Sequence, residues 1–131
     1  MRSRLAILFA LSAALAACGD DGTPRSAVPQ PPTFDDPNLS AGRSVWMSTC
    51  RNCHLTGVAG APALHDYPAW TPRIAKGRDA LHASVLHGIG DGTAWRMPPR
   101  GGNPALSDAQ VRQSVDYTLA AVEWLRQGGV P

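Results

Sequence analysis

The chain has 131 residues, which limits it to one small domain once targeting and linker segments are set aside. Its 12 basic and 10 acidic residues give a formal charge of +2, too near neutral for a protein that binds nucleic acid through its phosphates. Apolar residues make up 44% of the chain and aromatic residues only 6%, a composition that favours a small helical core.

The N-terminus has the pattern of an export signal. Two arginines precede an apolar run from Leu5 to Ala17 that ends in small residues. The run is thirteen residues long, shorter than the roughly 20 that a membrane-spanning helix needs, although an uncleaved signal-anchor helix is the alternative. Its end, LAAC, resembles the lipobox of bacterial lipoprotein precursors. The resemblance implies that residues 1–17 are removed and that lipid on Cys18 tethers the mature chain to the periplasmic side of a bacterial membrane.

A linker follows the expected lipid attachment site. Between Gly19 and Asn38 there are five prolines and four aspartates and almost no large apolar side chain. Such a composition buries too little apolar surface to fold. We therefore expect a disordered tether over residues 18–38, including the lipidated cysteine, and one folded domain over residues 39–131.

The folded part is expected to open with a helix. Ser40 is a candidate N-cap for a helix from Ala41 to about Cys50, in which Val45 and Trp46 supply the apolar contacts.

The string CRNCH, residues 50–54, is the C-x-x-C-H pattern of covalent haem attachment. Cys50 and Cys53 lie three apart on one helical turn, so both thiols can reach the two vinyl groups of one haem, and His54 can offer its imidazole to the iron. A C-x-x-C pair also occurs in zinc sites and redox dithiols. A zinc site needs two further soft ligands, and the only other cysteine is Cys18; a dithiol fold needs alternating strands and helices. We therefore predict one covalent haem c.

The sixth iron ligand should lie far along the chain, and Met97 is the candidate. It opens the sequence MPPRGG, whose prolines stiffen a loop and whose glycines permit tight turns. The other methionine of the mature chain, Met47, lies one turn before Cys50, where it cannot reach the opposite haem face. Core filling is the alternative role for a methionine. Three histidines are rival ligands that would make a bis-histidine site: His65, His82 and His87.

Two further helices are indicated by their patterns. The region from about Arg78 to His87 carries apolar residues four apart. A last helix starts at the capping box formed by Ser107 and Gln110, continues with an apolar stripe and ends at Gly128 and Gly129. No segment shows sustained strand alternation. The expected fold class is therefore all-α, with three to five short helices around one covalently bound haem.

Residues 40–131 resemble class I cytochromes c, most closely the bacterial cytochrome c5 type. The resemblance rests on CRNCH, on GVAGAP at residues 57–62, on Trp70 with Arg73, and on MPPRGGN at residues 97–103 followed by the last helix. One departure is that c5 proteins often carry an additional cysteine pair near the methionine loop, and this chain has none.

The resemblance implies specific contacts. In class I cytochromes c the first and last helices cross closely, and Gly42 with Trp46 one turn later fits that crossing. The carbonyl of Pro62 is expected to accept a hydrogen bond from the non-ligating nitrogen of His54, which raises the basicity of the ligand. Trp70 and Arg73 are candidate neighbours of the haem propionates through an indole N–H and a guanidinium, with a core position as the alternative for Trp70.

The expected function is single-electron transfer in a periplasmic or respiratory chain, with both axial iron positions filled, no small-molecule substrate and no enzymatic turnover. The alternatives are a haem sensor or small peroxidase with a labile methionine, and a cytochrome subunit of a larger oxidase or dehydrogenase. An acidic redox partner is expected to face a group of cations near the haem crevice, although scattered solvated charges are the other interpretation: Arg51, Arg73, Lys76, Arg78, Arg96 and Arg100.

Overall fold

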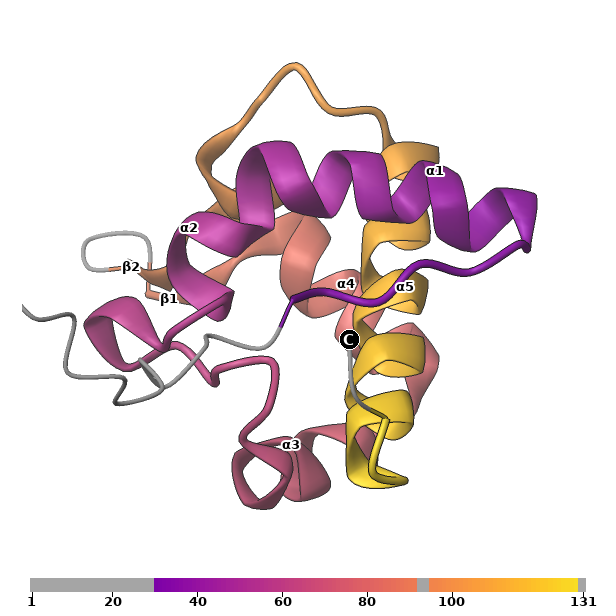
Figure 1. Cartoon of the computed structure of the whole chain (residues 1–131). Helices are drawn as coiled ribbons and strands as arrows, with labels where there is room; N and C mark the ends of the chain where they lie inside the picture. Colours follow the sequence, from indigo (N-terminus) through magenta and orange to yellow (C-terminus); the bar gives the residue numbers. More distant parts are fainter. Residues whose placement is uncertain (1–29, 92–94, 130–131) are drawn as a thin grey trace, which may run out of the picture.

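Two helices from opposite ends of the sequence, α1 (Pro37–Val45) and α5 (Asp108–Arg126), cross and frame the molecule, as Figure 1 shows. The structure is a computed structural model that describes residues 30–91 and 95–129. The signal peptide, Cys18 and most of the expected tether therefore lie outside the described residues.

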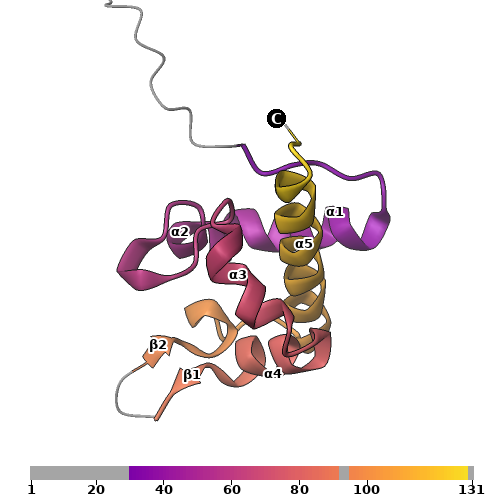
Figure 2. The ribbon, with the colours of Figure 1, turned by 90° about the horizontal axis from the view of Figure 1, so that it is seen from below.

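The remaining elements follow α1 in chain order: a π-helical turn (Trp46–Cys50), α2 (Arg51–His54), a 3-10 turn (Val58–Gly60), α3 (Tyr67–Ile74), α4 (Arg78–His87), β1 (Ile89–Gly90), β2 (Trp95–Met97) and a second 3-10 turn (Pro99–Gly102). The view in Figure 2 shows α2, α3 and the β1–β2 pair on the same side of α5. The expected all-α architecture of short helices is confirmed. The only sheet in the described ranges is the short antiparallel pair β1–β2.

The start of α1 differs from the sequence prediction. Asp36, and not Ser40, is the N-cap: its carboxylate accepts a hydrogen bond from the Leu39 N–H at 2.9 Å, and Pro37 occupies the first helical position. Ser40 lies inside the first turn, where its N–H donates to the Asp36 carbonyl. An Asp-Pro pair satisfies one exposed N–H and pre-sets the helical φ angle, so the helix begins four residues earlier than expected.

The packed part of the chain also begins before the predicted boundary at residue 39. The Arg43 guanidinium donates to the carbonyls of Pro31 and Pro32 at 3.3 and 3.0 Å, and the Tyr117 hydroxyl donates to the Pro32 carbonyl at 2.8 Å. The Phe34 ring meets the Tyr117 ring edge-on at 6.0 Å. Residues 31–34 therefore form a strap that packs across α1 and α5. Composition alone assigned these residues to the disordered tether, because it does not show that Arg43 and Tyr117 donate hydrogen bonds to their carbonyls.

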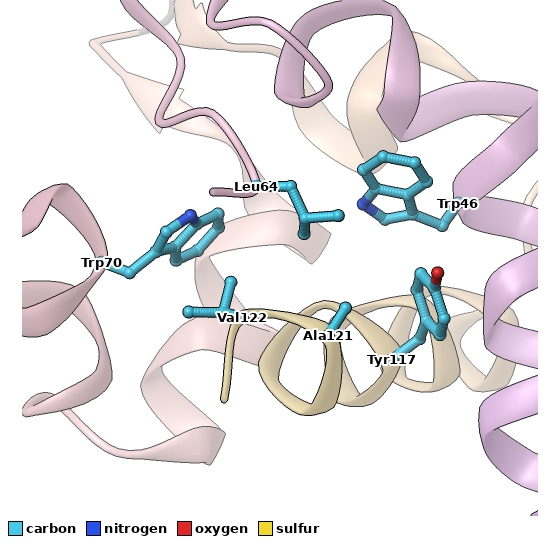
Figure 3. Packing of buried hydrophobic residues seen from close by; sticks show 6 residues of the cluster. All are labelled: Trp46, Leu64, Trp70, Tyr117, Ala121 and Val122. Carbon is cyan, nitrogen blue, oxygen red and sulfur yellow. The ribbon is translucent and has the colours of Figure 1, made fainter. Parts of the chain in front are cut away.

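The crossing of α1 and α5 depends on Gly42, as the resemblance to class I cytochromes c implied. A Cβ atom at this position would lie 2.0 Å from the Gln113 carbonyl oxygen of α5, so only glycine permits the approach. One turn later the fully buried Trp46 ring lies 5.9 Å from the fully buried Tyr117 ring. Figure 3 shows the other members of this core, which link the helix crossing to the middle of the chain: Leu64, Trp70, Ala121 and Val122.

Two predictions of local structure are confirmed. The middle helix, α4, has the bounds that the apolar spacing indicated. At the start of α5 the Gln110 N–H donates to the Ser107 hydroxyl oxygen at 3.3 Å, and the Ser107 N–H donates to the Gln110 side chain at 2.9 Å, which is a complete capping box. In the described parts of the chain, no helix combines the length and the apolar character needed to cross a bilayer.

The helix crossing gives the first testable prediction. Gly42→Ala in the haem-loaded protein is expected to lower the free energy of unfolding by about 2–3 kcal/mol, because the new methyl group meets backbone rather than a movable side chain. Ser44→Ala, at an exposed position of the same helix, should change it by less than about 0.5 kcal/mol. Denaturant unfolding followed by far-UV circular dichroism measures both, and equal stabilities of the two variants would contradict the account.

Candidate functional site

The C-x-x-C-H residues lie where α1 passes into α2. Cys50 ends the π-helical turn, in which the Arg51 N–H bonds the Trp46 carbonyl, and Cys53 and His54 belong to α2. π-helical turns of this kind are frequent at functional sites. Neither cysteine is part of a disulfide; Cys50 is half-buried and Cys53 is exposed.

The environment of Cys50 argues against a redox dithiol. Burial raises the pKa of the Cys50 thiol, although a hydrogen bond with Ser114 partly offsets this. Reactive dithiols instead need a lowered thiol pKa. Within the described ranges, no three His, Cys, Asp or Glu side chains are grouped so that they could hold a metal ion, so the zinc alternative has no ligand set there either.

The imidazole of His54 is held by the backbone eight residues later. Its Nδ1 lies 3.0 Å from the Pro62 carbonyl oxygen. Because a carbonyl only accepts, Nδ1 carries the proton and Nε2 keeps its lone pair for a metal. Burial lowers the pKa of His54, outweighing the opposite effect of the Pro62 hydrogen bond, and the nearby Arg73 lowers it further. A lowered pKa favours the neutral ring, which is the form that binds a metal.

The turn between His54 and Pro62 depends on backbone conformations that favour glycine. Gly57 has a φ of +83°, and a Cβ there would lie 3.2 Å from the Ala61 carbonyl oxygen. The Leu64 N–H then donates to the His54 carbonyl at 2.7 Å, which closes the loop between these two residues.

Trp70 and Arg73 lie beside His54, and each already donates a hydrogen bond to a backbone carbonyl. The indole N–H of Trp70 donates to the Ala63 carbonyl at 2.8 Å, so the predicted contact with a propionate would require breaking that bond. The Trp70 side chain is buried and its ring lies 5.9 Å from the His54 ring. The Arg73 guanidinium donates to the Ala69 carbonyl and lines an open pocket together with Pro62.

The methionine loop packs against the haem-motif segment. Met97 is half-buried, ends β2 and is paired with Ile89 of β1. A Cβ on Gly88, at the end of α4, would lie 2.9 Å from the Met97 carbonyl oxygen, and one on Gly101 would lie 3.2 Å from the methyl group of Thr49. Thr49 directly precedes Cys50, so the loop lies against the turn that carries the first thiol. Figures 1 and 2 both show α2 and the β1–β2 pair at the same end of the molecule.

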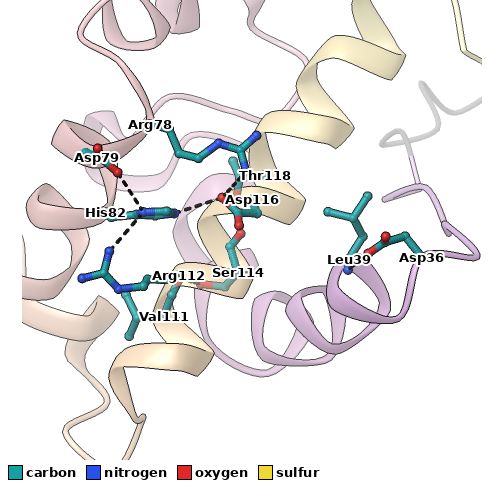
Figure 4. Close-up of polar contacts among 10 residues, drawn as sticks. All are labelled: Asp36, Leu39, Arg78, Asp79, His82, Val111, Arg112, Ser114, Asp116 and Thr118. Carbon is teal, nitrogen blue, oxygen red and sulfur yellow. Dashed lines mark hydrogen bonds and ion pairs between the residues drawn. The ribbon is translucent and has the colours of Figure 1, made fainter.

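The rival ligands are placed differently. His82 is buried between α4 and α5, where Nε2 lies 2.9 Å from Asp116 and Nδ1 lies 3.3 Å from Arg112, as Figure 4 shows. Both ring nitrogens are thus engaged. His65 and His87 are exposed, and Met47 packs against the hydrophobic core.

The residues fit a covalently held haem by their donor chemistry: two thiols on one turn, a neutral imidazole with Nε2 available, and a thioether on a loop that packs against the same turn. A small helical domain with crossing terminal helices and this donor set defines a class I c-type cytochrome.

The comparisons with known proteins establish the family. The protein-family profile described as "Cytochrome C oxidase, cbb3-type, subunit III" matches residues 37–117, and the chain belongs to this family. It is similar to cytochrome c-555 of Chlorobaculum thiosulfatiphilum, with 45% identity over 82 residues that cover 63% of this chain and 94% of the relative. It is 35% identical over 68 residues to cytochrome c5 of Ectopseudomonas mendocina, covering 50% of this chain and 72% of the relative.

A solved structure has the same fold. It is titled as the electron transfer complex of nitrite reductase with cytochrome c; the match has 46% identity and a TM-score of 0.55, and covers 63% of this chain and 94% of the matched chain. The resemblance to class I cytochromes c is thereby confirmed, with higher identity to c-555 than to the c5 protein above. The protein is a monohaem c-type electron carrier, not an enzyme, and it holds one covalently bound haem c.

Proposed function

We propose that this cytochrome is tethered to the periplasmic side of a bacterial membrane and passes single electrons between redox proteins, with Cys50 and Cys53 as its thioether attachments and His54 and Met97 as its axial ligands. The observation that carries the ligand assignment is the hydrogen bond from His54 Nδ1 to the Pro62 carbonyl oxygen, which leaves Nε2 for iron. When bound, the haem supplies the one-electron Fe(II)/Fe(III) couple.

The residues of the chain set the conditions for that couple. Pro62 fixes the tautomer and orientation of His54, and its acceptor oxygen makes the imidazole a stronger donor to iron. The buried side chains of Leu64 and Trp70 pack near His54 and keep water from that part of the core. A thioether from Met97 favours Fe(II), so it raises the reduction potential above that of a bis-histidine site.

The ligand assignment predicts the behaviour of Met97→Ala. The oxidised haem-loaded protein should show the weak red charge-transfer band of ferric iron bound to a thioether, and the reduced protein should not bind carbon monoxide. Met97→Ala should lose the band and bind carbon monoxide, whereas Met47→Ala should retain the band. Carbon monoxide binding by the unsubstituted protein would contradict the proposal and favour the sensor or peroxidase alternative.

The two ends of the proposed tether are set by the expected cleavage site of the export signal and by the start of the strap. We place signal-peptide removal after residue 17 and lipid on Cys18, and the tether then runs from Cys18 to the start of the strap at Pro31. At about 3 Å per residue an extended chain of this length reaches about 40 Å from the membrane surface. The domain would thus keep enough freedom to meet more than one partner.

The tether is tested by expressing the full chain and Cys18→Ala in a bacterial host. The unsubstituted protein should fractionate with membranes, and mass spectrometry should find its first residue to be an acylated Cys18. Because the substituted precursor lacks the acceptor thiol, it should carry no lipid. A membrane-bound protein that retains residues 1–17 without acylation would contradict the proposal and support the signal-anchor alternative.

Only some of the cations predicted to line the haem crevice are available to dock an acidic partner. Arg78 pairs with Asp116 at 2.9 Å and Arg100 with Asp108 at 2.6 Å, so neither charge is uncompensated. The other exposed cations of the group have no ion pair within the described ranges: Arg51, Lys76 and Arg96. We assign the docking of an acidic partner to these three.

The docking assignment is tested with hexacyanoferrate, an anionic oxidant. At low ionic strength, replacing Arg51, Lys76 and Arg96 together by Gln should slow oxidation of the reduced protein about tenfold, and the difference should vanish at high salt. Arg126→Gln removes one exposed cation at the far end of α5 and should have little effect. Equal salt dependence in the triple variant and the unsubstituted protein would contradict the assignment.

A second candidate is a cytochrome subunit of a larger oxidase, which the description of the matching family profile favours. Co-purification of this chain with an oxidase after mild detergent extraction would support this candidate over a free carrier.

A further inference from the structure

The turn that follows Met97 contains an unusual backbone conformation at Arg100. Arg100, Gly101 and Gly102 all have left-handed φ angles, of +54°, +64° and +83°. Glycine meets this demand without steric cost at the second and third positions, but an arginine adopts it at the first. Strained backbone of this kind clusters at functional sites, which directs attention to the contacts of the Arg100 side chain.

The Arg100 guanidinium joins the methionine loop to the start of α5. Its Nη1 donates to the Leu106 carbonyl oxygen at 2.9 Å and its Nη2 donates to Asp108 Oδ1 at 2.6 Å. These two acceptors flank Ser107, the N-cap of α5. Hydrogen bonds between ionised groups are stronger than neutral ones, and the planar guanidinium fixes their direction.

Met97 itself is paired with Ile89 of β1, and the contacts made by the turn that follows it, apart from those of Arg100, are steric or weak. Gly88 and Gly101 are close-packed against neighbouring atoms, and the Asn103 amide lies 3.5 Å from the Thr49 hydroxyl. The fork from Arg100 is thus the strongest polar link between this turn and the helical frame in the described structure. Because α5 is itself close-packed against α1 at Gly42, the link connects the Met97 loop to the crossing of the two terminal helices.

We infer that Arg100 is a positioning residue for the sixth iron ligand: its guanidinium latches the turn after Met97 to the start of α5 and so keeps the thioether on the iron. The inference rests on the proposed ligation by Met97. It adds an interaction that opposes dissociation of the Met97 thioether from the iron. A thioether is a soft, neutral ligand, so a competing ligand binds whenever the loop opens. Its apparent affinity is therefore set by the fraction of molecules with the loop open.

The test is the apparent affinity of imidazole for the ferric, haem-loaded protein. Arg100→Gln should increase it about tenfold, because loss of the two charge-assisted bonds raises the open fraction. Arg100→Gly should increase the imidazole affinity to a similar extent, although glycine adopts the left-handed backbone conformation without strain. Arg100→Lys keeps the charge but cannot make both hydrogen bonds, so its affinity should fall between those of the unsubstituted protein and Arg100→Gln. The matched control is Arg126→Gln, which breaks the exposed pair with Glu123 at the other end of α5 and should leave the affinity unchanged.

The outcomes separate the latch from simpler explanations. A purely structural role for Arg100 would lower the unfolding midpoint and leave imidazole affinity under native conditions unchanged, and this result would overturn the inference. Asp108→Asn should reproduce part of the effect and replaces Arg100→Gln if that variant does not fold. If the unsubstituted protein and Met97→Ala bind imidazole equally well, the proposed ligation fails and the latch fails with it. If only Met97→Ala binds more tightly, the ligation stands and the latch alone is wrong.

Discussion

The close approach of α1 and α5 at Gly42 is the constraint on which the rest of the structure depends. With no side chain at this position the Gln113 carbonyl comes within a distance that no Cβ would tolerate. The contact allows Trp46 and Tyr117 to pack as fully buried neighbours. It also sets the direction in which α1 continues into the turn that carries Cys50, and it fixes the helix to which Arg100 is bound.

The part of the site around His54 is organised by two consecutive backbone carbonyls. Pro62 accepts from His54, and Ala63 accepts from Trp70. Both donors are buried or half-buried, so each bond avoids the cost of an unsatisfied polar group. The same short segment thus orients the candidate ligand and the aromatic ring beside it. Under the proposed ligation, this arrangement would hold the imidazole with Nε2 available to iron.

Local sequence patterns were sufficient to predict those structural features that a few neighbouring residues determine. The capping box at Ser107, the bounds of α4 and the C-x-x-C-H motif all depend on residues less than ten positions apart. Apart from the crossing of the first and last helices, which the resemblance to class I cytochromes c implied, contacts between distant segments could not be anticipated. The strap at Pro31 and Pro32 exists because Tyr117, far along the chain, donates to it. The acceptor of the Trp70 indole and the partners of the Arg100 guanidinium likewise become visible only when the loops are placed in space.

Ligation of the iron by His54 and Met97 is the central claim, and the proton NMR spectrum of the reduced, haem-loaded protein tests it most directly. A methionine methyl group bound to ferrous iron lies over the haem ring, whose ring current moves its three-proton resonance far upfield. The account predicts one such resonance, lost in Met97→Leu and retained in Met47→Leu. Its absence from the unsubstituted protein, or its persistence in Met97→Leu, would contradict the account.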